Sequence, residues 1–101
     1  TDNFFDFIML YDVLHYLNSR QRNILYKKIY RILQIEGILS IHPKHTIGNF
    51  PLMELRDTTL DELINEIETV EFKYVENICS KLSHDNYIEN GCVINFRKID
   101  N

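Results

Sequence analysis

The feature that most constrains this chain is its opening segment, FFDFIMLYDVLHYL, at residues 4–17. Residues 5–10 are apolar with one charge among them, which is typical of a strand buried on both faces of a parallel sheet. The apolar run gives way to Tyr11 and Asp12, and His15 follows three residues later. Ligand sites in open parallel sheets lie beyond the carboxyl ends of the strands. We therefore expect these three residues to lie at or near a site.

A helix and a second strand are predicted next. Asn18 or Ser19 can cap a helix, and Gln21 stands three residues after Asn18, in the capping-box position. Apolar residues then recur at helical spacing, at Ile24, Leu25, Ile29, Ile32 and Leu33. Gly37 follows where a left-handed residue is often needed, and the apolar run at 38–41 indicates a strand. A strand, a helix and a strand with short connections predict a right-handed βαβ unit.

The second strand also ends in a polar cluster, His-Pro-Lys-His. Because both strands of a βαβ unit end at the same edge, we expect His42, Lys44 and His45 to lie near Tyr11 and Asp12. Such side chains could hold an anionic substrate or accept a proton, and a polar loop at a strand end is the simpler alternative. A metal site is disfavoured, because H-x-x-H lacks helical spacing and no cysteine or carboxylate lies within a few residues.

The rest of the chain predicts one more helix and two strands. Residues 46–57 contain glycine and proline and indicate a loop over the same edge. Thr59 starts a T-x-x-E capping pattern, followed by an apolar stripe typical of a helix with one buried face. Residues 72–82 and 92–97 indicate strands, and the turn-forming residues 83–91 indicate a hairpin connection between them.

Composition excludes several classes of function. The 101 residues suffice for one modest domain, and the formal net charge of −4 argues against broad binding to nucleic acid. Cationic side chains on the first predicted helix would then form a solvated face rather than a nucleic-acid site, at Arg20, Arg22, Lys27, Lys28 and Arg31. No apolar run approaches the roughly 20 residues of a membrane span. The amino terminus shows no signal-peptide pattern.

The two cysteines, Cys79 and Cys92, are too few for a disulfide scaffold. They lie on predicted paired strands and could be neighbours, but we expect buried free thiols in a reducing cytosol. The chain begins without methionine, which suggests part of a longer cytoplasmic protein.

The order strand, helix, strand, helix and closing hairpin resembles the carboxy-terminal half of a class I S-adenosylmethionine-dependent methyltransferase of the small-molecule type. The resemblance rests on three segments, FDFIMLYDVLHYL, IYRILQIEGILSIHPKH and KLSHDNYIENGCVINFRK, and it covers essentially the whole chain. The family shows an F-D-x-apolar strand, an Asp-x-Leu-His segment and an arginine-leucine helix end before a strand that starts with glycine. Its Lys-Pro-Gly-Gly loop is replaced here by Gln-Ile-Glu-Gly, at 34–37.

The resemblance implies an α/β fold with a mixed sheet of order 4-5-7-6, in which the last strand is antiparallel. It also implies S-adenosylmethionine as cofactor and a small-molecule methyl acceptor. The family's glycine-rich cofactor loop would lie upstream of Thr1, so the chain would carry half of a site and would be inactive alone. The implied cofactor-side residues are Leu10, Tyr11, Asp12 and His15. The substrate-side candidates are His42, Lys44 and His45.

Methyl transfer needs mainly positioning of the acceptor, so the sequence names no catalytic residue. The first strand would become a bare edge in the chain alone, which is a liability for pairing with other chains. We therefore expect the isolated chain to be unstable, oligomeric or paired with its missing half. The alternative function is a non-enzymatic α/β module that recruits a partner through this edge.

Overall fold

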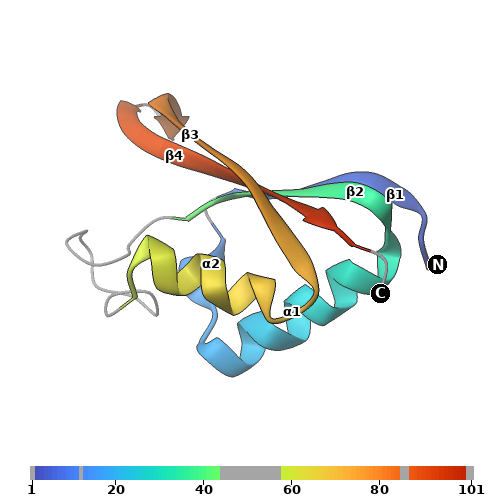
Figure 1. Ribbon diagram of the computed structural model, residues 1–101. Helices are drawn as coiled ribbons and strands as arrows, with labels where there is room; N and C mark the ends of the chain where they lie inside the picture. The colour runs from blue at the N-terminus through green and yellow to red at the C-terminus, as the bar shows by residue number, and fades with distance from the viewer. Residues whose placement is uncertain (1, 12, 44–57, 85–86, 100–101) are drawn as a thin grey trace.

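The computed structural model describes residues 2–11, 13–43, 58–84 and 87–99. It has two layers, a four-stranded sheet and two helices that lie together on one face of that sheet (Figure 1). In chain order the elements are β1 (Phe5–Tyr11), the 3-10 turn η1 (Leu14–Tyr16), α1 (Ser19–Ile32), β2 (Leu33–His42), α2 (Leu60–Glu68), β3 (Phe72–His84) and β4 (Tyr87–Lys98). No helix in the described part of the chain is both long enough and apolar enough to cross a membrane.

The strand order is β1-β2-β4-β3. β1 and β2 are parallel, and β4 runs antiparallel to both of its neighbours, β2 and β3. This arrangement confirms the predicted mixed sheet, in which the last strand in sequence inserts beside the second. It also places β1 at one edge of the sheet.

The prediction that β1 is buried on both faces is wrong for this chain. Ile8 and Leu10 pack against the core, whereas Phe5, Phe7 and Met9 are 44%, 50% and 54% exposed. Alternate side chains of a strand point to opposite faces, and both helices cover the same face. The row of Phe5, Phe7 and Met9 therefore lies on the open face of the sheet.

The core lies between the sheet and the helices. β2 and β4 supply its centre, and both helices contribute from below (Figure 1). Its fully buried apolar side chains include Tyr26, Leu39, Ile41, Leu63, Ile67, Ile94 and Phe96. Each buried side chain of this size contributes roughly 1.5–3 kcal/mol relative to an exposed one, so this layer dominates the stability of the fold.

The predicted start of α1 is confirmed in detail. Asn18 Oδ1 accepts the backbone N–H of Gln21 at 2.9 Å, and Gln21 Oε1 accepts the backbone N–H of Asn18 at 2.9 Å. At the start of α2, the Thr59 hydroxyl accepts the N–H of Glu62 at 3.1 Å and donates to its carboxylate at 3.0 Å. Both helices thus begin where their capping residues predict.

Gly37 does not have the role that the sequence suggested. α1 ends at Ile32, β2 begins at once, and the left-handed residue is Glu36, with a φ of 71°. Gly37 is instead required for space. A Cβ there would lie 2.7 Å from the carbonyl oxygen of Gln34 and 2.8 Å from Cγ of Leu33.

Arg22 was expected in the solvated face of α1, but it is only 4% exposed. It joins the two helices, because its Nε and Nη2 donate to the two carboxylate oxygens of Glu66 at 2.7 and 3.0 Å. Tyr26 donates its hydroxyl to the same carboxylate at 2.9 Å. The bond to Glu66 raises the pKa of Arg22. Burial, then the Glu66 charge, raise the pKa of Tyr26.

The closing hairpin is longer than predicted. β3 continues to His84 and β4 starts at Tyr87, so most of the expected connection at 83–91 is paired strand. Cys79 and Cys92 are directly opposite each other and form a disulfide with their Cα atoms 4.0 Å apart. The expectation of free thiols is therefore wrong, because strand pairing brings the two side chains within bonding distance.

Candidate functional site

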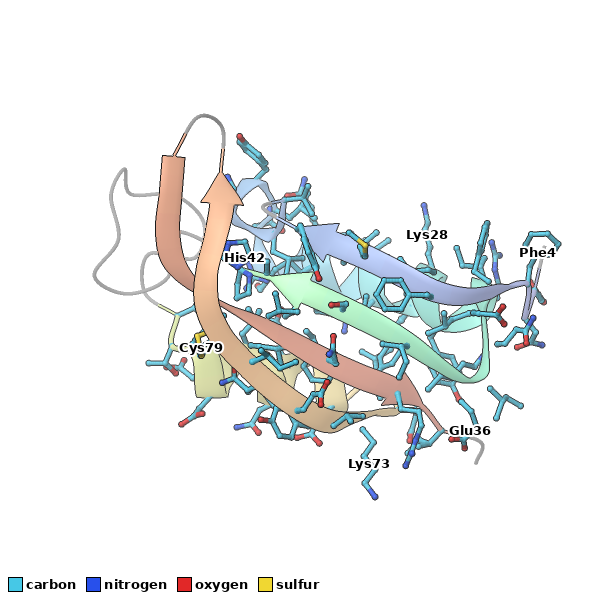
Figure 2. All side chains as sticks on the ribbon, turned by 90° about the horizontal axis from the view of Figure 1, so that it is seen from above. Phe4, Lys28, Glu36, His42, Lys73 and Cys79 are labelled. Carbon is cyan, nitrogen blue, oxygen red and sulfur yellow. A yellow bond between two sulfur atoms is a disulfide. The ribbon has the colours of Figure 1, made fainter. Side chains whose placement is uncertain are left out.

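The carboxyl ends of β1 and β2 lie side by side, and they place two predicted site residues together. Tyr11 is paired in register with His42, and the two rings meet edge to face with centroids 6.2 Å apart. The Tyr11 hydroxyl is hydrogen-bonded to Ser40 Oγ at 3.0 Å. Figure 2, which looks onto the open face, shows His42 at the end of β2 beside the end of β1. Tyr11, Ser40 and His42 thus form one polar cluster, which we call the strand-end cluster.

His42 is held by the antiparallel strand on its other side. Its Nδ1 lies 2.9 Å from the carbonyl oxygen of Cys92 on β4. The side chain is only 7% exposed, and its Nε2 has no hydrogen-bond partner among the described residues. A buried polar atom without a partner is uncommon in folded proteins and calls for an explanation.

A polar row extends across the sheet from this cluster. Ser40 is paired in register with Asn95 on β4, and Asn95 Nδ2 donates to Glu76 Oε1 on β3 at 3.0 Å. Sequence reasoning did not single out Ser40 or Asn95. The signal was present, since each is a polar residue inside an otherwise apolar strand, ILSI and CVINF.

The other cofactor-side candidates are placed differently. Leu10 turns its side chain toward the core, so only its backbone is available at the strand end. His15 lies in η1, is 2% exposed and packs against the Tyr16 ring, with centroids 4.1 Å apart. Asp12 is outside the described residues.

Lys44 and His45 also lie outside the described residues. Within the part of the chain that is described, no group of three or more His, Cys, Asp or Glu side chains is arranged to hold a metal ion.

The chemistry of the strand-end cluster suits a small, uncharged or cationic ligand. Its described side chains supply an aromatic ring, two hydroxyls and an imidazole, and Tyr11 is 38% exposed. A positively charged group is attracted to the face of such a ring. The residues present therefore fit a ligand with a sulfonium centre, such as S-adenosylmethionine.

No protein-family model matches the sequence, and no curated protein sequence matches it either. Solved structures do match the fold. The 1,6-didemethyltoxoflavin-N1-methyltransferase of Burkholderia thailandensis, bound to 1,6-didemethyltoxoflavin and S-adenosylhomocysteine, matches with a TM-score of 0.74 and 19% identity over 99% of this chain and 46% of its own. An O-methyltransferase family 2 protein of Planctomyces limnophilus, in complex with apigenin, matches with a TM-score of 0.67 and 26% identity over 93% of this chain and 31% of its own.

The chain has the fold of the carboxy-terminal half of a class I methyltransferase domain. It spans about half or less of the solved structures named here. The cyclase SpnF shares the same half-domain, with a TM-score of 0.71 and 16% identity over 97% of this chain and 51% of its own. The half-domain therefore occurs in proteins named for different reactions, and the reaction must be argued from the site.

Proposed function

We propose that this chain is the carboxy-terminal part of an S-adenosylmethionine-dependent methyltransferase that acts on a small molecule. The observation that carries the proposal is the strand-end cluster, which lies at the carboxyl ends of the two parallel strands of a methyltransferase half-domain. Ligands of such sheets bind beyond these strand ends. A bound S-adenosylmethionine supplies a methyl group on a positively charged sulfur, and the thioether left behind takes the electron pair of the broken bond.

In this proposal the two strand ends have different roles. We assign contacts with the cofactor to the Leu10 backbone, the Tyr11 ring, Asp12 and His15, and contacts with the methyl acceptor to His42, Lys44 and His45. The Tyr11 ring suits a sulfonium by cation–π attraction. We also infer a cytoplasmic location.

The test uses the coding sequence upstream of Thr1. We expect a glycine-rich loop about 80 to 100 residues before Thr1, the usual size of the first half of such a domain. The longer chain should bind S-adenosylmethionine with a micromolar Kd in a calorimetric titration, and the 101-residue chain should give no binding heat. A longer chain without binding contradicts the proposed function. Micromolar binding by the 101 residues alone contradicts the half-site.

A second candidate is an interaction module without enzyme activity. The observation that favours it is the edge strand β1, whose open-face side chains Phe5, Phe7 and Met9 are about half exposed. An apolar edge strand is a template for strand addition by another chain, including a second copy of this one. Self-association that persists in the longer chain, together with a failure to bind S-adenosylmethionine, would favour this candidate.

A further inference from the structure

His42 is held in one orientation by a bond that also fixes the position of its protons. Its Nδ1 lies 2.9 Å from the Cys92 carbonyl oxygen. A carbonyl oxygen only accepts hydrogen bonds, so Nδ1 must carry the hydrogen. In a neutral imidazole, the other nitrogen is then an acceptor with a free lone pair. β4 therefore sets the tautomer of a residue at the end of β2.

The nitrogen with the lone pair is the one without a partner. Nε2 of His42 is buried and has no hydrogen bond among the described residues. The Tyr11 hydroxyl, on the residue paired with His42, is bonded to Ser40 instead. The Tyr11 ring meets the His42 ring edge to face, and this ring contact supplies no hydrogen-bond donor to Nε2. A buried acceptor of this kind destabilises the fold until a donor reaches it.

The lone pair also selects the chemistry of the ligand. A neutral acceptor nitrogen attracts an O–H or N–H donor and repels an anionic oxygen. This argues against the anionic substrate that the sequence allowed for His42, and for a hydroxyl or an amine.

We propose that Nε2 of His42 accepts the proton of the hydroxyl or amine that receives the methyl group, an inference that rests on the proposed function. As the oxygen or nitrogen of the acceptor forms its bond to the methyl carbon, its proton moves to Nε2. The imidazole becomes an imidazolium, whose Nδ1–H stays on the Cys92 carbonyl. His42 then returns this proton to water. Because it contacts the acceptor, His42 is a catalytic residue in this scheme.

The first test is spectroscopic and uses the longer chain. Long-range ¹H–¹⁵N correlation spectra distinguish the two histidine tautomers, and the signals that disappear in a His42→Asn variant are those of His42. We expect the Nδ1–H tautomer. Phenol, used as a hydroxyl donor, should shift the Nε2 resonance in the direction of hydrogen bonding. An Nε2–H tautomer, or an Nε2 resonance that phenol leaves unchanged, overturns the inference.

The second test separates His42 from the rest of the site. Asparagine can keep a donor to the Cys92 carbonyl but places nothing at the Nε2 position. His42→Asn should therefore melt within a few degrees of the wild type and keep its S-adenosylmethionine Kd. It should bind phenol about 10-fold more weakly, as expected for one lost hydrogen bond. Unchanged phenol affinity overturns the inference. If the longer wild-type chain does not bind S-adenosylmethionine, the proposed function is overturned. The His42 tautomer measured in the first test would still hold.

Discussion

At the scale of single residues, two neighbouring positions in the first half of β2, Glu36 and Gly37, place opposite demands on the side chain. Glu36 has a φ of 71°, which disfavours any side chain with a Cβ, by roughly 1–2 kcal/mol. Gly37 has no such backbone angle, but its missing Cβ leaves room for the Gln34 carbonyl and the Leu33 side chain. The strained left-handed backbone angle is therefore at Glu36, one residue before Gly37, the residue that could adopt it without strain.

We expect Glu36→Gly and Gly37→Ala to change stability in opposite directions. Glu36→Gly should raise the free energy of unfolding by up to about 1 kcal/mol, because it removes the left-handed strain. It also removes an exposed ion pair with Arg97 at 3.1 Å, which contributes little. Gly37→Ala should lower stability by about 1–3 kcal/mol through overpacking. Urea unfolding of both variants measures the two effects, and a stabilising Gly37→Ala would contradict this account.

At the scale of elements, the hairpin of β3 and β4 divides into a supported and an unsupported part. β4 pairs with β2 only from Ile94 to Arg97, whereas β3 and β4 pair with each other as far as His84 and Tyr87. The outer part of the hairpin projects beyond the rest of the sheet (Figure 1). A two-stranded hairpin alone is marginally stable in water. The Cys79–Cys92 disulfide lies where this unsupported part begins.

Reduction of this disulfide should loosen the outer hairpin and spare the four-stranded part. A cross-link that closes a loop of this length stabilises by about 3 kcal/mol. Amide hydrogen exchange beyond Cys79 should therefore accelerate by roughly 100-fold on reduction, while amides of β1 and β2 change little. A Cys79→Ser, Cys92→Ser double variant should behave like the reduced protein under oxidising conditions. Equal amide exchange rates of the outer hairpin in the oxidised and reduced protein would show that the hairpin is stable without the disulfide.

The elements that local patterns determine were predictable from the sequence. Capping residues located both helix starts, and the apolar runs located β1 and the second half of β2, whose first half from Leu33 was expected to be helix and loop. What failed depends on contacts that are distant in sequence. Arg22 can be buried because it forms an ion pair with Glu66 on the other helix. The two cysteines form a disulfide because the register of β3 and β4 pairs Cys79 with Cys92. The candidate site shows the same division. The βαβ unit predicted that Tyr11 and His42 would lie together, whereas the hydrogen bond from His42 to Cys92 depends on the distant strand β4 and was not predicted.

At the scale of the whole molecule, helices cover one face of the sheet and leave the other face open. Both helices pack on one face (Figure 1). The other face carries the exposed side chains of Phe5, Phe7 and Met9, and Met9 is paired in register with Ser40 of the polar row. An apolar row on an edge strand favours pairing with another chain. The whole-molecule expectation is therefore that this chain associates with itself when it is alone in solution.

We expect sedimentation to show concentration-dependent association of the 101-residue chain in the micromolar range. Phe7→Lys should weaken this association at least about 10-fold, because a bound copy would bury the Phe7 ring, and lysine on an edge strand opposes pairing. Ile24→Lys is the matched control, since Ile24 is 47% exposed on α1 rather than on β1, and Phe7 is 50% exposed. An equal effect of both variants would indicate nonspecific hydrophobic association. A wild-type monomer with one cooperative melt would show instead that β1 is stable as a free edge.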